Sequence, residues 1–237
     1  MKYDFFQNPR RQLRFWRDYF RFSRLAGERP PLKKLYPILN EADRSAGDLG
    51  VYFYQAVWAT QQIATARPGR HVDVGSHLFY VGILSTVVPV TFVDIRPVRL
   101  DLPGFVFQQG SLLELPFPDK GLASVSCLHV VEHVGLGRYG DPINPDGTRL
   151  ALSELTRVLA PGGILYLSAP VGRPHIRFNA HRVLAASWIL EWCRPLELVA
   201  FAAVDARGVY HPVAAVRDYD DAPESYGFFR LTRPTAG

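Results

Sequence analysis

From residue 71 onward, strand-like and helix-like segments alternate, and this alternation constrains the fold more than any other feature of the chain. Short apolar runs are typical of buried strands, and between them apolar residues recur at helical spacing. Helices are predicted at 52–66, 79–87, 148–159 and 183–193, and strands at 71–75, 91–95, 106–109, 123–129, 163–168, 196–204 and 227–232. The pattern predicts an α/β fold of the Rossmann-like, doubly wound type. We expect a mostly parallel seven-stranded sheet with helices on both faces and an N-terminal helical extension.

Composition fits one globular core in a reducing compartment. The chain has 237 residues, of which 48% are hydrophobic, and this is enough to bury one substantial core. Cys127 and Cys193 are the only cysteines, too few for a disulfide scaffold or a cysteine-based zinc site. No apolar run reaches the roughly 20 residues that cross a bilayer, and the first residues are charged and aromatic where a signal peptide would be apolar. We therefore expect a cytoplasmic protein.

The basic charge is concentrated at the N-terminus. Residues 1–34 hold ten Lys or Arg against three Asp or Glu, which leaves seventeen against nineteen for the remainder. We expect two parts, a basic aromatic helical arm at 1–34 and a Rossmann-type domain at 35–237. Between residues 5 and 25 arginines alternate with aromatic residues, which predicts an amphipathic basic helix. That helix fits three interpretations: packing on the domain, peripheral contact with an anionic membrane, or docking of an acidic substrate. No nucleic-acid recognition motif accompanies the charge, so we expect no nucleic-acid partner.

Acidic residues end two consecutive predicted strands. Asp73 precedes Gly75, whose missing Cβ lets a ligand approach the backbone, and a carboxylate there can accept from an amino group or a hydroxyl. Asp94 follows about 20 residues later, where a carboxylate can hold both ribose hydroxyls. A dinucleotide site would need further glycines, but His77 and Phe79 stand there. S-adenosylmethionine carries no phosphate, so its site tolerates the loss of these glycines better than a dinucleotide site does. The alternative is that residues 71–76 form a plain strand and turn without a ligand site.

Several longer runs resemble a known superfamily. The runs P-F-P-D, S-V-S, H-V-V-E-H and E-L-T-R-V-L-A-P-G-G-I-L between residues 116 and 165 resemble class I S-adenosylmethionine-dependent methyltransferases. The runs H-V-D-V-G-S, F-V-D-I-R-P, E-H-V-G-L-G-R-Y-G-D-P and F-N-A-H-R-V are similar to a narrower, methyltransferase-like bacterial family catalogued as a domain of unknown function. Some members of that family are linked to surface-polysaccharide genes. The resemblance covers residues 35 to 204.

The resemblance implies S-adenosylmethionine as cofactor and S-adenosylhomocysteine as product. It assigns the methionine part to Asp73, Gly75 and Ser76, and the ribose to Asp94. It assigns the adenine to Ser111 and Leu112. The other implied cofactor-binding residues are His77, Ile95, Cys127 and His129. Two departures from the superfamily's pattern, the residues at 77 and 79 and the serine in place of the commoner acid at 111, imply a weaker or reshaped pocket.

Two polar segments are predicted to converge on the methyl group. The loop at 135–147 and the cluster at 178–182 follow strands whose ends meet at one edge of the sheet. We expect an acceptor pocket formed by Arg138, Tyr139, Asn179, His181 and Arg182. Its arginines suit an anionic acceptor such as a nucleotide-linked or acidic sugar. Methyl transfer needs in-line approach, and a base only if the acceptor is a hydroxyl. The candidate catalytic bases are His133, Asp141 and His181.

Other chemistries fit the sequence less well. His129, Glu132 and His133 match the H-x-x-E-H pattern of inverted zinc proteases, but that pattern needs a helix, and Gly135 and Gly137 interrupt one here. We therefore predict no metal. A short-chain nicotinamide enzyme would need a Tyr-x-x-x-Lys pair, which the chain lacks. The prediction is a methyltransferase acting on a small molecule, a sugar or nucleotide-sugar of surface-polysaccharide synthesis. The alternative is a catalytically inactive protein that binds S-adenosylmethionine or S-adenosylhomocysteine, or acts as a scaffold, with the same fold.

Overall fold

The computed structural model describes residues 9–39 and 49–235. The chain divides into two compact units, Met1–Leu49 and Gly50–Gly237, and each is described here by itself. The division falls after Leu49, whereas the sequence placed it after residue 34. The structure gives the reason, because Leu39 is buried and its carbonyl accepts a hydrogen bond from Arg14 Nη2 at 3.1 Å. The segment after residue 34 therefore packs with the arm.

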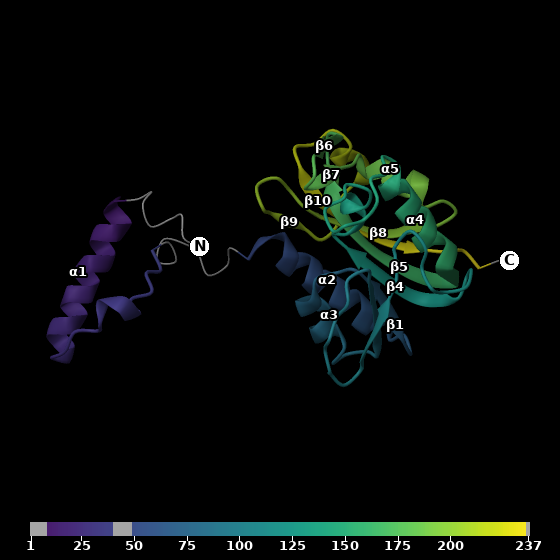
Figure 1. Cartoon of the computed structure of the whole chain (residues 1–237). Helices are drawn as coiled ribbons and strands as arrows, with labels where there is room; N and C mark the ends of the chain where they lie inside the picture. The colour runs from purple at the N-terminus through teal and green to yellow at the C-terminus, as the bar shows by residue number, and fades with distance from the viewer. Residues whose placement is uncertain (1–8, 40–48, 236–237) are drawn as a thin grey trace. The chain divides into compact units, whose positions relative to one another are not determined.

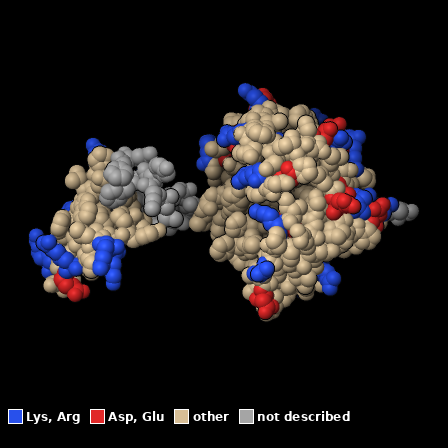
Figure 2. Space-filling model, viewed as in Figure 1, with Lys and Arg blue, Asp and Glu red and all other residues tan. Residues whose placement is uncertain are grey.

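The N-terminal unit contains the predicted basic helix. Helix α1 spans Pro9–Ala26, and the short 3₁₀ helix η1 spans Leu32–Lys34. The predicted residues before Pro9 lie outside the described part of the chain. Tyr19 on α1 donates a hydrogen bond from its hydroxyl to the carbonyl of Pro30 at 2.9 Å, which holds the returning segment against the helix. On the visible face of this unit, basic side chains gather over the C-terminal end of α1 and over η1 (Figure 2).

The C-terminal unit alternates helices with the strands of one large sheet. The helices are α2 (Gly50–Ala66), α3 (Leu78–Leu84), α4 (Gly147–Val158) and α5 (Ala186–Trp192), with 3₁₀ helices η3 (Val131–His133) and η4 (Val216–Tyr219). The strands of the sheet are β1 (His71–Val74), β2 (Val90–Asp94), β3 (Phe105–Gln109), β4 (Leu122–Leu128), β5 (Leu159–Val171), β8 (Glu197–Val204), β9 (Tyr210–His211) and β10 (Ser225–Thr232). Strands β6 (His175–Arg177) and β7 (His181–Val183) form a separate hairpin.

The sheet is mostly parallel, as predicted, and has eight strands where seven were expected. The strand order is β3-β2-β1-β4-β5-β10-β8-β9. Strands β1 to β5 pair in parallel, whereas β10 is antiparallel to both β5 and β8. The additional strand, β9, contributes only two residues, which pair with Ala203 and Val204 at the sheet edge. A strand this short leaves no alternating pattern, so its sequence gave no strand signal.

Each face of the sheet is covered by its own pair of helices, which makes a three-layer α/β/α arrangement (Figure 1). Side chains alternate along β5, so Leu165 and Leu167 pack in the core under α4 and α5, while Tyr166 packs in the core under α2 and α3. Apolar surface is thus buried on both faces of the sheet, as expected for strands whose sequences are continuous apolar runs. Within the described residues, no helix combines the length and apolarity needed to cross a membrane.

The connectivity brings four strand ends together. The chain builds outward from β1 to β2 and β3, then returns to the other side of β1 to form β4. The carboxyl ends of these four parallel strands therefore lie side by side at one edge of the sheet. In open α/β sheets, ligands bind where the strand order reverses in this way.

Candidate functional site

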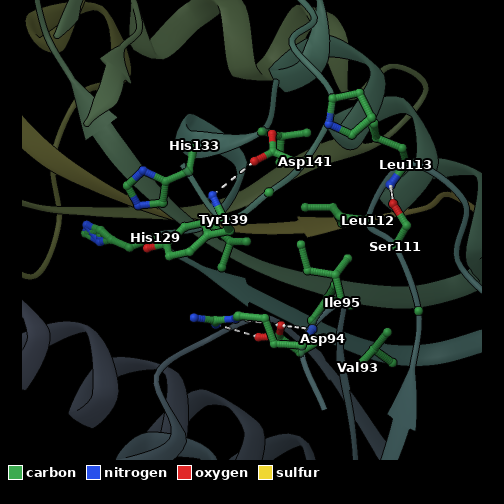
Figure 3. Close-up of a pocket in the computed structure, with 18 residues that line it drawn as sticks. Val93, Asp94, Ile95, Ser111, Leu112, Leu113, His129, His133, Tyr139 and Asp141 are labelled. Atoms are coloured by element: carbon green, nitrogen blue, oxygen red, sulfur yellow. Dashed lines mark hydrogen bonds and ion pairs between the residues drawn. The ribbon is translucent and has the colours of Figure 1, made fainter. Parts of the chain in front are cut away.

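A cavity of about 340 Å³ lies at the carboxyl ends of β1 to β4. Val74 and Gly75 lie at the end of β1, Val93 and Asp94 end β2, and the other lining residues come from the segments after β2, β3 and β4. In Figure 3, Asp94 and Ile95 lie along one side of the cavity and Leu112 lies along the adjacent side. His129 and His133 lie at the opposite end. The cavity thus has an apolar end and an end lined by imidazoles. Its size is within the range of small-molecule sites in proteins.

Gly75 is required where it stands. Its φ of 71° lies in the left-handed region, and its N–H donates to the Val93 carbonyl at 2.8 Å, which ties the turn to β2. A Cβ at this position would lie 2.9 Å from Val130 Cγ1. Only glycine avoids both the strain and the clash. The turn therefore presents bare backbone to the cavity.

Asp73 points into the protein and does not line the cavity. Its side chain is completely buried, and it accepts hydrogen bonds from Ser76 N at 3.1 Å, from Ser76 Oγ at 2.7 Å and from Ser126 Oγ. Ser76 Oγ in turn accepts from Leu128 N at 2.9 Å. Burial raises the pKa of the Asp73 carboxyl to about 7, although these hydrogen bonds lower it in part. The network fastens the turn after β1 to the end of β4.

The same network continues along β1. The ring of His71 lies between two β4 hydroxyls, with Nδ1 2.7 Å from Ser124 Oγ and Nε2 2.8 Å from Ser126 Oγ. Burial lowers the pKa of His71 to about 3, so the imidazole is neutral at ordinary pH. Tyr80 also donates its hydroxyl to Ser126 Oγ at 3.3 Å. Buried polar groups are thus hydrogen-bonded between β1, β4 and α3.

Asp94 lines the cavity, and Arg96 holds its carboxylate. Arg96 donates from Nε to Oδ1 at 3.0 Å and from Nη2 to Oδ2 at 2.8 Å, and its backbone N–H reaches Oδ1 at 2.8 Å. The Asp94 side chain is buried, whereas that of Arg96 is 57% exposed. The Arg96 guanidinium also lies 4.7 Å from the ring centre of Tyr139. A polar ligand at Asp94 would therefore compete with a largely solvated arginine.

The imidazole end of the cavity has unusual electrostatics. His133 Nδ1 donates to the Ala180 carbonyl at 2.6 Å, and this contact assigns the proton to Nδ1 and leaves Nε2 as an acceptor. Burial lowers the pKa of His133 to about 4 and that of His129 to about 3, so both rings are neutral at pH 7. His129 Nδ1 lies 2.9 Å from Gln55 Oε1. A neutral His133 with a bare Nε2 can take a proton.

Glu132 lies beside His133 and is fully buried. Its Oε1 is 3.6 Å from His133 Nε2, and among the described residues Oε2 has no hydrogen-bond partner. Burial raises the pKa of Glu132 to about 8, so the carboxyl is mostly protonated at pH 7. Sequence reasoning considered Glu132 only as part of a zinc motif. The structure makes it a neutral neighbour of the candidate base.

The two loops predicted to converge do meet. Arg138 Nη1 donates at 2.9 Å to the same Ala180 carbonyl that His133 contacts, which joins the loop at 135–147 to the β6–β7 hairpin. Asp141 lines the cavity, but its oxygens already accept from Gly135 N at 2.6 Å and Tyr139 N at 3.2 Å. Asp141 therefore shapes the loop, and this lowers its availability as a base.

The structure brings about half of the predicted residues to the cavity. Those that line it are Gly75, Asp94, Ile95, Ser111, Leu112, His129, His133, Tyr139 and Asp141. Those that do not are Asp73, Ser76, His77, Cys127, Arg138, Asn179, His181 and Arg182.

The reasons for the second group differ. Asp73, Ser76 and Cys127 are buried beneath the cavity. His77 caps helix α3 by accepting from the Phe79 backbone, and both rings are exposed and stacked outside the cavity, so they do not fill it. Asn179 is exposed on the hairpin, and His181 Nε2 lies 3.1 Å from Glu224 Oε1.

Arg182 is a correction to the predicted acceptor pocket. Its guanidinium is buried and donates to the carbonyls of Val134, Asn144 and Pro145 at 2.6 to 3.3 Å, and to Thr148 Oγ1 at 3.2 Å. Because these groups surround it, Arg182 holds the loop at 135–147 and is not placed to bind an acceptor.

Arg96 was not among the site residues predicted from the sequence. Its position two residues after Asp94 was a signal that could have found it. The H-x-x-E-H run directly follows β4 and includes one turn of 3₁₀ helix, with His129 at a positive φ of 55°. Its two histidines contact Gln55 and Ala180, so they do not lie on one face of a helix as the zinc motif requires.

The mostly parallel sheet with helices on both faces is the Rossmann-like fold found in solved structures of class I S-adenosylmethionine-dependent methyltransferases. Residues 120–197 match a family model described as Caenorhabditis protein of unknown function, DUF268. No curated protein matches the chain.

Solved structures with this fold share little sequence with the chain. The [4+2]-cyclase SpnF matches with a TM-score of 0.56 and 17% identity, over 95% of this chain and 97% of its own. The N-methyltransferase NodS of Bradyrhizobium japonicum WM9, in complex with S-adenosylhomocysteine, matches with a TM-score of 0.53 and 13% identity, over 79% of this chain and 90% of its own. An N-methyltransferase of Haemonchus contortus, in complex with phosphomonomethylethanolamine and S-adenosylhomocysteine, gives 0.50 and 12%, over 75% and 53%.

The buried Asp73 carboxyl predicts a specific pH dependence of stability. Its pKa is about 7 in the folded protein and about 3.8 in the unfolded chain, so between pH 4 and 7 only the folded state holds the proton. The free energy of unfolding should therefore fall as the pH rises through this window, by up to roughly 1.4 kcal/mol per pH unit. Asp73→Asn removes this titration. Urea unfolding at pH 5 and pH 8 should show the wild type losing stability relative to Asp73→Asn, while the exposed control Asp101→Asn keeps the wild-type profile. Parallel profiles for all three proteins would contradict the assignment.

The buried Arg182 predicts a loss of stability on substitution. Arg182→Met leaves several loop carbonyls without donors, which should lower the free energy of unfolding by about 2 to 3 kcal/mol in urea. The control Arg149→Met removes an exposed ion pair with Asp146 and should change stability by less than about 0.5 kcal/mol. Unchanged stability of Arg182→Met together with weakened ligand binding would instead make Arg182 a ligand-binding residue.

Proposed function

We propose that the chain is an S-adenosylmethionine-dependent methyltransferase acting on a small molecule. The observation that carries this proposal is the cavity at the ends of β1 to β4, where the Gly75 backbone, the Asp94 carboxylate and the Leu112 side chain line one continuous space. A methionine chain, a ribose and an adenine need these three kinds of surface in this order. The S-adenosylhomocysteine held by NodS and by the Haemonchus enzyme supports the same cofactor here.

In this arrangement the adenosyl group occupies the end with Ile95 and Leu112, and its ribose hydroxyls take the place of Arg96 on Asp94. Asp73 contributes indirectly, because its hydrogen bonds fix the turn whose backbone meets the methionine part. His129 and His133, which line the opposite end of the cavity, would then lie near the methyl donor. Methyl transfer needs an acceptor held in line with that sulfonium, so orientation carries much of the rate.

His133 is the proposed base when the acceptor is a hydroxyl or a protonated amine. Its ring is neutral, its Nδ1 proton is engaged by Ala180, and Nε2 is free to accept. Asp141 and His181 support the site less directly, since one is bonded to loop backbone and the other to Glu224.

We propose an anionic acceptor, such as a sugar phosphate or a nucleotide-linked sugar of surface-polysaccharide synthesis. Arg96 and Arg138 both place their guanidinium groups against the ring of Tyr139, at 4.7 and 5.1 Å, and Tyr139 lines the cavity. The Arg96 guanidinium and the Tyr139 phenol at the cavity, with the Arg138 guanidinium on the Tyr139 ring beside it, are suited to a phosphorylated or acidic sugar. The sequence resemblance to a family linked with polysaccharide genes supports the same acceptor class.

A scaffold without catalysis is the second candidate. The residues at 77 and 79 leave the turn with fewer glycines than the superfamily usually has, and Arg96 holds the ribose-binding carboxylate. SpnF, which has a similar fold, is a [4+2]-cyclase, so the fold alone does not define the reaction.

Cofactor binding should depend on Asp94. Asp94→Asn removes the charged acceptor for two hydroxyls, a loss of roughly 1.5 to 3 kcal/mol, or about ten- to a hundredfold in the dissociation constant for S-adenosylhomocysteine. Isothermal titration calorimetry measures this dissociation constant. Asp101 is an exposed acid outside the cavity, so the Asp101→Asn control should bind like the wild type. No heat with either S-adenosylmethionine or S-adenosylhomocysteine on the wild type would favour the scaffold.

Turnover should depend on His133. We expect His133→Ala to lower the rate of methyl transfer by about a hundredfold or more while binding of S-adenosylhomocysteine is kept, because a positioned base typically contributes at least that factor. The assay follows labelled methyl groups from S-adenosylmethionine into a panel of sugar phosphates and nucleotide sugars. His211→Ala, at the far edge of the sheet on β9, is the control and should keep the wild-type rate. Loss of cofactor binding with unchanged turnover would show that the role is misassigned.

A further inference from the structure

The N-terminal helix α1 carries a stripe of four exposed arginines that the proposed enzyme chemistry does not use. Arg10, Arg17, Arg21 and Arg24 are separated by seven, four and three residues. This spacing places them along one side of the helix, since residues three or four apart share a face. Asp18 is the only acidic residue of α1, and it pairs with Arg17 at 2.9 Å. The helix as a whole therefore carries six arginines against one acid.

Another side of the same helix already has its partner. Trp16, Tyr19 and Ser23 lie on this side, where Ser23 is buried and Tyr19 bonds the Pro30 carbonyl. The unit thus has an inner face that holds the returning chain and an outer face with the arginines.

Large apolar side chains flank the arginine stripe and are exposed. Leu13 is 70% exposed and Leu25 is 78% exposed, and Phe20 and Phe22 are each about half exposed. On a helical projection of 100° per residue, Leu13 and Phe20 fall on one side of the stripe and Leu25 and Phe22 on the other. An outer surface made of arginines between exposed leucines and phenylalanines is costly in water. It is the composition of helices that lie in the plane of a membrane surface.

We propose that the N-terminal unit binds the surface of membranes that contain anionic lipids. The arginines meet lipid phosphates, and the flanking leucines and phenylalanines enter the boundary between headgroups and acyl chains. The helix lies on the membrane and does not cross it, because its charged stripe excludes it from the hydrocarbon core. This inference does not depend on the proposed methyl transfer.

A nucleic acid would explain the arginines but not the leucines. Phosphate contacts use the charged side chains, and stacking on bases uses aromatic rings, whereas exposed aliphatic side chains gain little from a nucleic-acid backbone. Leu13 and Leu25 therefore favour the lipid surface. The two partners also respond differently to loss of these leucines, so the test can separate them.

The test is co-sedimentation of the full chain with vesicles. We expect binding to phosphatidylcholine vesicles that contain about a third phosphatidylglycerol, little binding to pure phosphatidylcholine, and weakening as salt rises. Replacing the exposed Arg10, Arg21 and Arg24 with Gln should weaken binding on the order of a hundredfold. Replacing the exposed Arg70, Arg99 and Arg194 of the C-terminal unit with Gln removes the same charge and should leave binding close to wild type.

A second variant tests insertion separately from charge. Leu13→Ser with Leu25→Ser keeps every arginine and should still lower vesicle binding several-fold, while binding to single-stranded RNA at the same salt should not change. Circular dichroism of each variant checks that the helix content is kept. Equal vesicle binding by the wild type and the Arg10/Arg21/Arg24 variant would overturn the proposal. Tighter binding to RNA than to anionic vesicles, with no effect of the leucine substitutions, would also overturn it.

Discussion

The hydrogen bonds of Asp73 are the interaction on which the cavity depends. They join the turn after β1 to Ser126 on β4, and Ser76 extends them to the backbone of Leu128. Because the carboxyl group is completely buried, these bonds are protected from water and fix the turn firmly. Gly75 can then expose its backbone to a ligand without a side chain in between. The sequence predicted that Asp73 contacts the ligand, whereas in the structure Asp73 holds in place the turn that lines the cavity.

Arg96 is the partner of Asp94 in this structure, and a ribose bound at the cavity would compete with it for the carboxylate. Without a ligand, Arg96 neutralises the carboxylate with a bidentate contact. The guanidinium is 57% exposed, whereas the carboxylate that it contacts is buried. A ribose would therefore have to supply hydrogen bonds in place of the guanidinium, which can turn toward solvent. Arg96 then remains near Tyr139, where a negatively charged acceptor would find it.

Much of the fold could be predicted from the sequence, because strand and helix periods are local properties. The parallel strands and the helices were found within a few residues of their observed bounds, and Gly75, Asp94 and Leu112 were correctly expected at neighbouring strand ends. The direction of Asp73 could not be predicted, since β1 is buried along its whole length and the alternation of side chains gives no outer face. Arg182 was misread for a similar reason. It stands in a short segment with Asn179 and His181, but the carbonyls that surround it come from a loop about 40 residues earlier.

The fold narrows the chemistry without deciding it, because cyclase and methyltransferase activities both occur on structures with this arrangement. The most direct test of the account is a crystal structure of the chain with S-adenosylhomocysteine. It should show both ribose hydroxyls on the Asp94 carboxylate, the Arg96 guanidinium displaced from it, and the adenine against Leu112. A ligand bound elsewhere, or an intact Asp94–Arg96 pair beside a bound cofactor, would contradict it.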